Sequence, residues 1–222
     1  MFMRSLETNA GHGRHRRGYR TSGFSLLEMM IVIAISLIAT VVSVVSLIPM
    51  LNSQHVTNAY NTTLSAMRQA RDNAVSQRTS YSVVFSKTVT PNTITVTPTL
   101  TFGGAQSTVT YSLPTDVTFQ TNSAISSTAA PDSFGSGANA IDFGYTAGGS
   151  TGIETIYFCP DGSAQTTSAC AGVNNWDGGV VYLARGTDLL TSRAISLWGG
   201  TGRIHGWRLY NKSGGGYQWL RQ

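Results

Sequence analysis

The sequence predicts an α+β fold in which one long N-terminal α-helix packs on a C-terminal, antiparallel β-rich domain. The chain begins with a basic stretch, continues with an apolar run that holds one charged residue, and then shows apolar residues at helical spacing. Beyond residue 80, short apolar or alternating runs are separated by turn-forming residues. We therefore divide the chain into residues 1–23, 24–50, 51–78 and 79–222.

Residues 1–23 have the composition of a removable, basic cytoplasmic leader peptide. They hold five arginines against one glutamate, a net charge of +4. This charge on one side of an apolar run predicts that the rest of the chain lies outside the cytoplasm. Without the leader, 10 basic and 9 acidic residues remain. The positive charge of the whole chain, +5, is therefore mostly a targeting property and not evidence of nucleic-acid binding.

Residues 24–50 are predicted to form a helix that spans a membrane. Residues 24–48 contain a single charged side chain, Glu28, and as a helix they would extend for about 37 Å, enough to cross a bilayer. The run is rich in Ile and Val, but a lone strand in lipid cannot satisfy its backbone hydrogen bonds, so a helix is favoured. Gly23 precedes the run, whereas a secretory signal is cut after its apolar region. We therefore expect the apolar segment to stay in the mature protein.

Residues 51–78 are predicted to continue as an amphipathic helix. Polar residues occupy one face, and the opposite face needs a cover, which we expect to be the β-rich domain. A single helix over 24–78 would be about 80 Å long. The apolar stripe consists of Val56, Tyr60, Leu64, Met67, Ala70 and Ala74.

The remainder of the chain, 79–222, is predicted to form ten short strands, with a loop over 121–140. Gly, Pro, Asn and Asp clusters separate the apolar or alternating runs, as in antiparallel sheets. The predicted strands are Tyr81–Phe85, Thr93–Thr97, Thr108–Leu113, Val117–Phe119, Ile141–Tyr145, Ile153–Phe158, Val180–Leu183, Ala194–Trp198, Arg203–Tyr210 and Tyr217–Leu220.

Charge in this domain is unevenly spread. Residues 79–184 carry a net charge of −5, and residues 185–222 carry +5. The two regions can attract each other within one folded domain or between neighbouring subunits, and the sequence leaves both interpretations open. The two cysteines, Cys159 and Cys170, are flanked by turn formers and are predicted to pair in an oxidising compartment. A metal site there is disfavoured, because no histidine or further cysteine lies near them in the sequence.

The N-terminal features resemble the class III signal of type IV pilins and type II secretion pseudopilins. The features are the basic leader, Gly23, the hydrophobic residue Phe24, Glu28 and about twenty apolar residues. The resemblance implies that a prepilin peptidase cuts between Gly23 and Phe24 and methylates the new N-terminus of Phe24. It implies a single-pass protein of the inner membrane, with its C-terminus in the periplasm, that later joins a filament. Its implied partners are other pilin or pseudopilin subunits, the inner-membrane assembly platform and membrane lipid.

Two further patterns resemble the GspH/FimT minor pseudopilins. Ala70, Arg71, Ala74 and Val75 match an Ala-Arg-x-x-Ala-aliphatic pattern at the end of the stalk helix. Near the C-terminus, residues 192–204 resemble the closing strands of these proteins, with a Thr-Gly-Arg turn between them. The resemblance implies a minor subunit that supports protein secretion or pilus assembly.

Glu28 lies near the expected membrane boundary, where a charge is less costly than the roughly 2.5–3.5 kcal/mol assigned to the bilayer centre. The family resemblance implies that it pairs with the free amine of Phe24 on a neighbouring subunit. Such a pair would set the axial register between subunits. The competing interpretation is an incidental glutamate at the membrane interface.

Enzyme activity is not expected, and neither is a cofactor, a metal site or a catalytic residue. The chain has no His-Glu-x-x-His, no Cys-x-x-Cys and no Walker loop. Outside the leader it has two histidines, His55 and His205. His55 lies on the predicted stalk helix, so Ser/His/Asp catalysis would depend on His205 alone.

The alternative function is capture of extracellular DNA for natural transformation. Some FimT-type minor pilins bind DNA through a basic Gly-Arg-x-Arg turn near the C-terminus, and residues 202–205 match it except that His205 replaces the second arginine. Basic residues interleaved with aromatic ones can hold phosphates and stack bases. The competing interpretation is a sheet edge with solvated arginines. The candidate DNA-binding residues are Arg203, His205, Arg208 and Lys212.

Overall fold

The computed structural model describes residues 23–99, 107–121, 125, 128–145, 151–170 and 177–222 of the 222-residue chain. Apart from Gly23, the leader predicted over 1–23 lies outside these residues. The chain divides into two compact units, Met1–Ser46 and Leu47–Gln222. Helix α1, Leu26–Gln77, begins in the first unit and ends in the second. The predicted α+β, pilin-like architecture is confirmed: an N-terminal apolar helix is followed by antiparallel sheets.

The first unit contains the apolar part of α1. Leu26–Val44 has a mean hydropathy of 2.4 and is long enough to cross a membrane. Its three hydroxyl side chains donate to backbone carbonyls one turn earlier: Ser36 to Val32, Thr40 to Ser36, and Ser43 to Ala39, at 2.7–2.8 Å. These hydroxyl groups are thereby satisfied within the helix itself, as an apolar environment requires.

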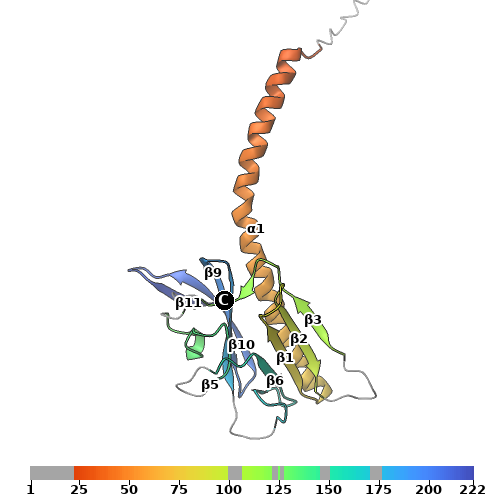
Figure 1. The fold of residues 1–222 in the computed structure, drawn as a ribbon, viewed down its shortest axis with the longest axis vertical. Coiled ribbons are helices and arrows are strands. Elements are labelled where there is room, and N and C mark those ends of the chain that lie inside the picture. The colour runs from red at the N-terminus through yellow and green to blue at the C-terminus, as the bar shows by residue number, and fades with distance from the viewer. Residues whose placement is uncertain (1–22, 100–106, 122–124, 126–127, 146–150, 171–176) are drawn as a thin grey trace, which may run out of the picture. The chain divides into compact units, whose positions relative to one another are not determined.

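The second unit contains two antiparallel sheets beside the end of α1 (Figure 1). The first sheet has the order β3 (Val109–Ser112), β2 (Thr93–Pro98), β1 (Tyr81–Ser86), β6 (Thr155–Phe158) and β7 (Ala164–Gln165). The second has the order β11 (Tyr217–Arg221), β10 (Arg203–Asn211), β9 (Asp188–Trp198), β8 (Gly178–Arg185) and β4 (Thr118–Phe119), and β5 (Ile141–Tyr145) also pairs with β8.

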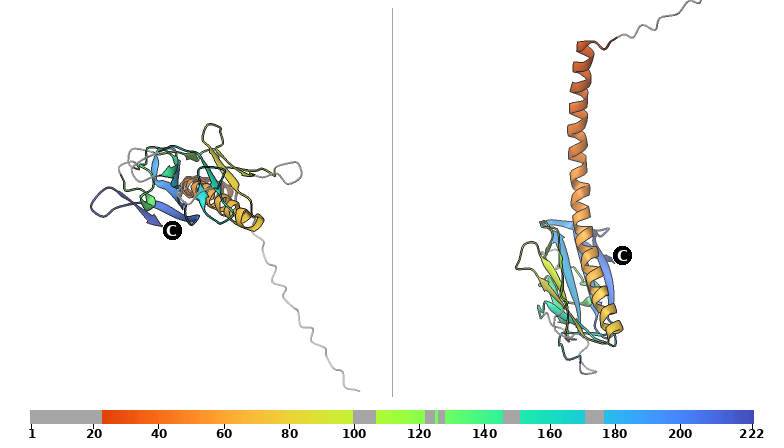
Figure 2. Two further views of the ribbon diagram at one scale, coloured as in Figure 1. Left: turned by 90° about the horizontal axis from the view of Figure 1, so that it is seen from below. Right: turned by 90° about the vertical axis from the view of Figure 1, so that its right-hand side faces the viewer.

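The main core lies between the second part of α1 and both sheets (Figure 2). The predicted apolar stripe of the helix supplies buried residues to it, and two of them are alanines, which let the backbone of the helix approach the strands closely. At Gly206 on β10, an added β-carbon would lie 1.6 Å from the Tyr60 hydroxyl oxygen. A glycine is therefore required where the helix and this strand meet. The buried stripe residues are Val56, Tyr60, Met67, Ala70 and Ala74.

A second cluster covers the other face of the second sheet. Because side chains alternate along a strand, Val181 and Leu183 face the main core while Val180 and Tyr182 face this cluster. The segment predicted as a loop, 121–140, supplies the cover through Ile125 and Phe134 and contains the short 3-10 helix η1, Pro131–Ser133. The central strand β8 is thus buried on both faces, which explains its uninterrupted apolar sequence.

The strands agree with the predicted ones, with two main differences. Strand β7 was not predicted, because two residues give no alternation to detect. The β8–β9 hairpin extends through Arg185 and Asp188 to a tight turn, whereas the sequence predicted shorter strands. At the hairpin end the added residues, Arg185 and 188–191, are exposed or half-buried, including Leu190 at 42%, so the buried pattern stops before the hydrogen-bonded ladder does.

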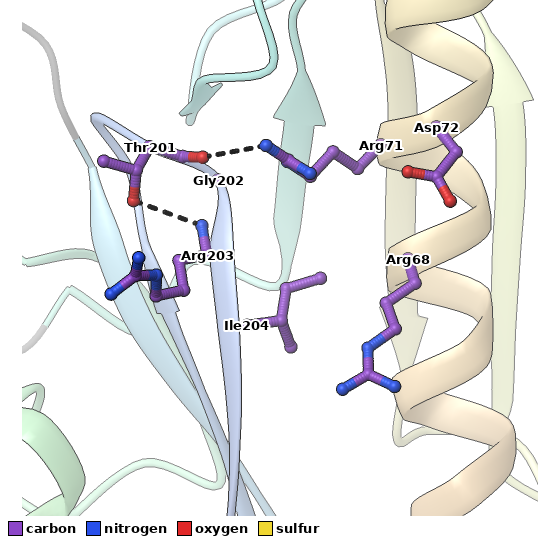
Figure 3. Close-up of a pocket in the computed structure, with 7 residues that line it drawn as sticks. All are labelled: Arg68, Arg71, Asp72, Thr201, Gly202, Arg203 and Ile204. Atoms are coloured by element: carbon purple, nitrogen blue, oxygen red, sulfur yellow. Dashed lines mark hydrogen bonds between the residues drawn. The ribbon is translucent and has the colours of Figure 1, made fainter.

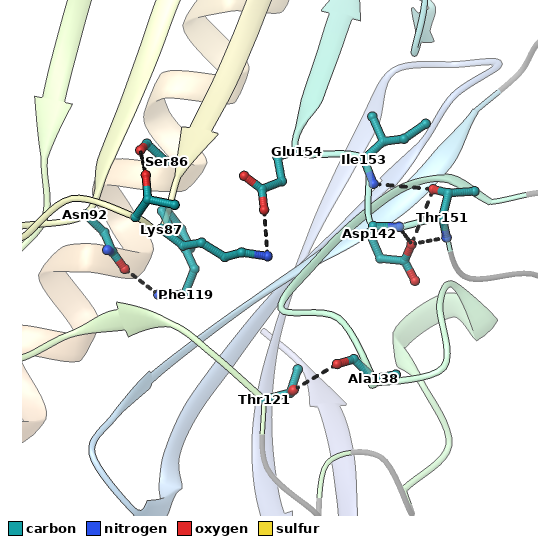
Figure 4. Close-up of polar contacts among 12 residues, drawn as sticks. Ser86, Lys87, Asn92, Phe119, Thr121, Ala138, Asp142, Thr151, Ile153 and Glu154 are labelled. Atoms are coloured by element: carbon teal, nitrogen blue, oxygen red, sulfur yellow. Dashed lines mark hydrogen bonds and ion pairs between the residues drawn. The ribbon is translucent and has the colours of Figure 1, made fainter.

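Two contacts tie the strands and their connecting segments together, and Figure 4 shows the first of them, between Asn92 and Phe119. The side-chain oxygen of Asn92 accepts a hydrogen bond from the backbone N–H of Phe119 at 2.8 Å. The structure also joins Cys159 to Cys170 by a disulfide, with the α-carbons 5.7 Å apart. This bond closes the segment that follows β6 and contains β7.

Candidate functional site

The predicted cleavage point lies just outside the helix. Gly23, Phe24 and Ser25 are not helical, and α1 begins at Leu26. A β-carbon on Gly23 would meet nothing within 4 Å, and Phe24 is 76% exposed. The peptide bond between Gly23 and Phe24 is therefore accessible and free of helical hydrogen bonds, as cleavage by a peptidase requires.

Glu28 occupies the first turn of α1 and is exposed. A carboxylate there is stabilised by the unpaired N–H groups of the helix start. In the part of the chain that the structure describes, Glu28 forms no ion pair. Its carboxylate is thus available to a partner from outside this chain.

A cleft of about 470 Å³ separates the second part of α1 from the β9–β10 turn (Figure 3). We call it the arginine cleft; it is lined by Arg68, Arg71, Asp72, Thr201, Gly202, Arg203 and Ile204. Figure 3 shows Arg68 and Arg71 on the helix, Ile204 pointing toward the helix from the strand, and Arg203 on the strand side with its guanidinium turned away from the helix. The two sequence patterns, one near the end of α1 and one near the C-terminus, therefore meet at one place in the fold.

Arg71 holds the walls of this cleft together. Its Nε donates to the carbonyl of Gly162 and its Nη2 to the carbonyl of Thr201, both at 3.2 Å. Gly202 has a φ of +58°, and a β-carbon on it would lie 2.0 Å from the Gly162 carbonyl oxygen. Arg71 is therefore engaged in fixing the β9–β10 turn, whereas Arg68 and Arg203 have no ion pair among the described residues.

His205 does not join a basic surface, contrary to its place in the predicted DNA-binding set. It is 8% exposed, and its Nδ1 lies 2.8 Å from Oδ2 of Asp132. Asp132 also accepts a hydrogen bond from the Ser196 hydroxyl at 2.5 Å. Burial opposes ionisation of Asp132, but the hydrogen bonds from Ser196 and His205 outweigh it and hold the pKa of this carboxyl below its usual range.

The Asp132 cluster differs from a hydrolase triad. In a triad, histidine lies between serine and aspartate and takes the serine proton. Here the aspartate lies in the middle, so Ser196 donates to a carboxylate and accepts from the indole N–H of Trp207 at 2.8 Å. Nδ1 of His55, on α1, instead lies 2.9 Å from Oδ2 of Asp116, within hydrogen-bond distance. The geometry of these groups therefore suits structure and not nucleophilic catalysis.

The remaining predicted DNA-binding residues are spread over different surfaces. Alternation along β10 puts Arg203 and Arg208 on opposite faces of the strand. Arg208 lies opposite Arg193 in the β9–β10 ladder, and its guanidinium carbon is 5.2 Å from the centre of the Tyr210 ring. Arg193 is 4% exposed, and burial, followed by the charge of Arg208, lowers its pKa to about 10. Lys212 is exposed beyond the end of β10.

Acidic side chains of 79–184 are engaged within the domain. Asp116 accepts from Arg185 at 2.5 Å, and Lys87 lies 2.6 Å from Glu154 (Figure 4). The others contact hydroxyl or backbone groups: Asp132 with Ser196, Asp142 with Thr151, Asp161 with Ser163 and Asp177 with Thr166. Few acids therefore remain to neutralise the arginines near the C-terminus, although the two regions have opposite net charge.

Comparison with known families identifies a motif at the N-terminal end of the chain. Residues 19–44 match the model of the prokaryotic N-terminal methylation motif. No curated protein and no solved structure matches the chain. The matched segment includes Gly23, Phe24 and Glu28 and overlaps the apolar start of α1, which is consistent with membrane anchoring. The motif and the helix that carries it support a type IV pilin-like family and indicate a pilin or pseudopilin that is processed by prepilin peptidase and assembles with other pilins.

Proposed function

We propose that this protein is a minor subunit of the GspH/FimT type. Before assembly it is anchored in the inner membrane with its C-terminal domain in the periplasm. It is then incorporated into a type II secretion pseudopilus or a type IV pilus. The observation that carries the proposal is the N-terminal arrangement: an accessible Gly23–Phe24 bond, followed by an apolar helix with one exposed carboxylate, Glu28, that forms no ion pair within the described part of the chain. The arginine cleft supports the branch, because there both GspH/FimT-like patterns contact each other.

In this proposal the peptidase cuts between Gly23 and Phe24, and Glu28 then binds the methylated amine of a neighbouring subunit. Once helices bundle and exclude water, an unpaired carboxylate becomes costly, so subunits that align the two charges are favoured. The pair sets the register of one subunit on the next. Its main effect is on specificity of assembly.

The mature N-terminus tests this function. Filaments are sheared from cells, and the protein in membranes and filaments is analysed by mass spectrometry. We expect a chain that begins with N-methylated Phe24 in both fractions. A Gly23→Glu variant should keep the leader and be absent from filaments, while Ser25→Ala, next to the same bond, is the processed control. Normal processing of the Gly23→Glu variant would place the cleavage site elsewhere.

The second candidate function is DNA capture, and one observation favours it: Arg68 and Arg203 line the same cleft without an ion pair among the described residues. Arg71 and Asp72 line it too, so the cleft keeps a net positive charge. A groove with unpaired guanidinium groups attracts phosphates. The DNA-binding site proposed from the structure therefore includes Arg68, which the sequence did not predict, and excludes His205, which is buried.

Salt-dependent binding of duplex DNA to the full-length protein in detergent micelles tests this candidate. Each lost phosphate contact lowers the slope of log K against log salt by about 0.9. We therefore expect Arg68→Ala and Arg203→Ala each to reduce the slope, with Lys87→Ala as a control because Lys87 already pairs with Glu154. Equal slopes in all four proteins, or no binding at low salt, would leave assembly as the function of the subunit.

A further inference from the structure

A second cavity lies on the other side of the second sheet, away from the residues that line the arginine cleft. It has a volume of about 450 Å³ and lies between residues 128–133 and the β10–β11 hairpin. We call it the aromatic hollow; the hairpin residues that line it are Trp207, Lys212, Tyr217, Gln218 and Trp219. Its volume is in the range of small-molecule sites, roughly 300–1,000 Å³.

Hydrogen bonds on the side away from solvent fix two residues that line the aromatic hollow, Trp207 and Asp132. The indole N–H of Trp207 donates to Ser196, and Ser196 donates to Asp132, so the ring and the facing segment share one hydrogen-bonded chain. Asp132 and Ser133 have φ values of +52° and +62°. Two successive non-glycine residues in this region are strained, and such strain persists where the surroundings impose it, often around ligands. The hollow is therefore pre-formed.

The chemistry of the lining is mixed. Trp207 and Tyr217, each partly buried, supply ring surface, while Asp132 supplies a carboxylate and Lys212 an ammonium group. The two charges cancel, so the lining favours neither a strong anion nor a strong cation. Gln218 lies opposite Tyr210 in the β10–β11 ladder, so its side chain is on the other face and only its backbone borders the hollow.

One donor in the lining is not used. Trp219 is 8% exposed, and its indole N–H is buried without a hydrogen-bond partner among the described residues. Buried tryptophan N–H groups usually find a partner, so an acceptor is missing here. A ligand with hydroxyl oxygens would offer one after a small movement of the ring.

We propose that the aromatic hollow binds an uncharged oligosaccharide. A sugar ring has an apolar face, which can cover Trp207 or Tyr217, and a rim of hydroxyl groups that both donate and accept. The rim suits Asp132 as acceptor, Lys212 as donor and the unpartnered indole N–H of Trp219 as a second donor. A phosphate-bearing ligand fits less well, because it would meet the ionised carboxylate of Asp132. This activity is separate from filament assembly, since none of the hollow's residues belongs to the N-terminal motif.

The test uses the full-length protein in detergent micelles and two probes, maltotriose and triacetylchitotriose. Binding is followed by tryptophan fluorescence and by saturation-transfer NMR. We expect saturable binding of at least one trisaccharide below about 10 mM. Trp207→Ala and Tyr217→Ala should each weaken it about tenfold or more. Lys212→Ala, an exposed position where folding is not at risk, should weaken it severalfold.

The matched control is Tyr210→Ala, because Tyr210 is 37% exposed on the opposite face of the same hairpin. Thermal unfolding shows which variants remain folded. No saturation with either sugar would overturn the proposal, and so would equal weakening by Tyr210→Ala. Tighter binding of a thymidine trinucleotide or of an acidic tripeptide would also overturn it and assign the hollow to another ligand class.

Discussion

Gly202 and Gly162 approach each other backbone to backbone, so that a β-carbon on Gly202 would lie 2.0 Å from the Gly162 carbonyl oxygen. We expect Gly202→Ala to lower the free energy of unfolding by about 3 kcal/mol or more, because the backbone must move and φ is also positive. Gly186→Ala is the control: its φ is +52°, but a β-carbon there meets nothing within 4 Å. Strain alone should make that variant about 1 kcal/mol less stable. Denaturant unfolding of both variants measures the difference.

Arg71 should be irreplaceable by lysine. Its planar guanidinium reaches two carbonyl groups, Gly162 and Thr201, in fixed directions, and one ammonium group cannot reproduce both hydrogen bonds. We expect Arg71→Lys and Arg71→Ala to destabilise the domain by about 1–3 kcal/mol. Arg68→Ala, one turn earlier on the same helix, should be nearly neutral. A stable Arg71→Lys variant would mean that the clamp contributes little.

Asp132 should make the free energy of unfolding of the domain fall as the pH is lowered into the acidic range. The pKa of Asp132 is lowered in the folded state, so its contribution is present above the ordinary carboxyl range and is lost as the pH falls through the folded pKa. At neutral pH we expect Asp132→Asn to be less stable by about 1–2 kcal/mol. Asparagine tolerates the positive φ at this position, so backbone strain does not confuse the comparison. Urea unfolding of both proteins between neutral pH and about pH 3 should show the difference shrinking in acid.

Glu28→Val should remove assembly and leave membrane insertion intact. The substitution makes the helix more apolar, but it leaves the amine of Phe24 on the next subunit without a counter-charge. An uncompensated charge in a dry interface costs about 3–5 kcal/mol. We therefore expect processed protein in the membrane and almost none in sheared filaments, measured by immunoblot. Ser36→Ala is the control, and normal incorporation of Glu28→Val would exclude Glu28 from register setting.

The disulfide should stabilise the segment that carries the Gly162 turn. Closing a loop of this length is worth about 2–3 kcal/mol. We expect the double variant Cys159→Ser/Cys170→Ser to have a free energy of unfolding lower by that amount. The parent protein in reductant should lose the same amount. Adding reductant to the double variant should change nothing further, and thermal unfolding of the four samples tests both statements.

Most helices and strands could be predicted from the local pattern of apolar residues. The contacts of the arginine cleft could be predicted to a lesser extent. The strand β1 and the stripe on α1 follow from alternation and from helical spacing. The segment 121–140 was expected to be a loop, but its cover of the second sheet depends on Phe134 and Ile125 meeting residues far away in sequence. The sequence could have separated Arg203 from Arg208, since an odd spacing along a strand changes the face. It could not have shown that Arg71 reaches Gly162 and Thr201, because no local pattern encodes these long-range contacts.

The hydroxyl groups of Ser36, Thr40 and Ser43 donate to carbonyls of their own helix, which limits what the membrane span can recognise. Polar side chains are the usual source of selectivity between helices in lipid. Within Leu26–Val44, that leaves Glu28 as the side chain best able to discriminate between neighbours. Under the proposed pairing of Glu28 with the Phe24 amine, such a span packs beside any subunit that presents this amine, so surfaces outside the bilayer select the neighbour.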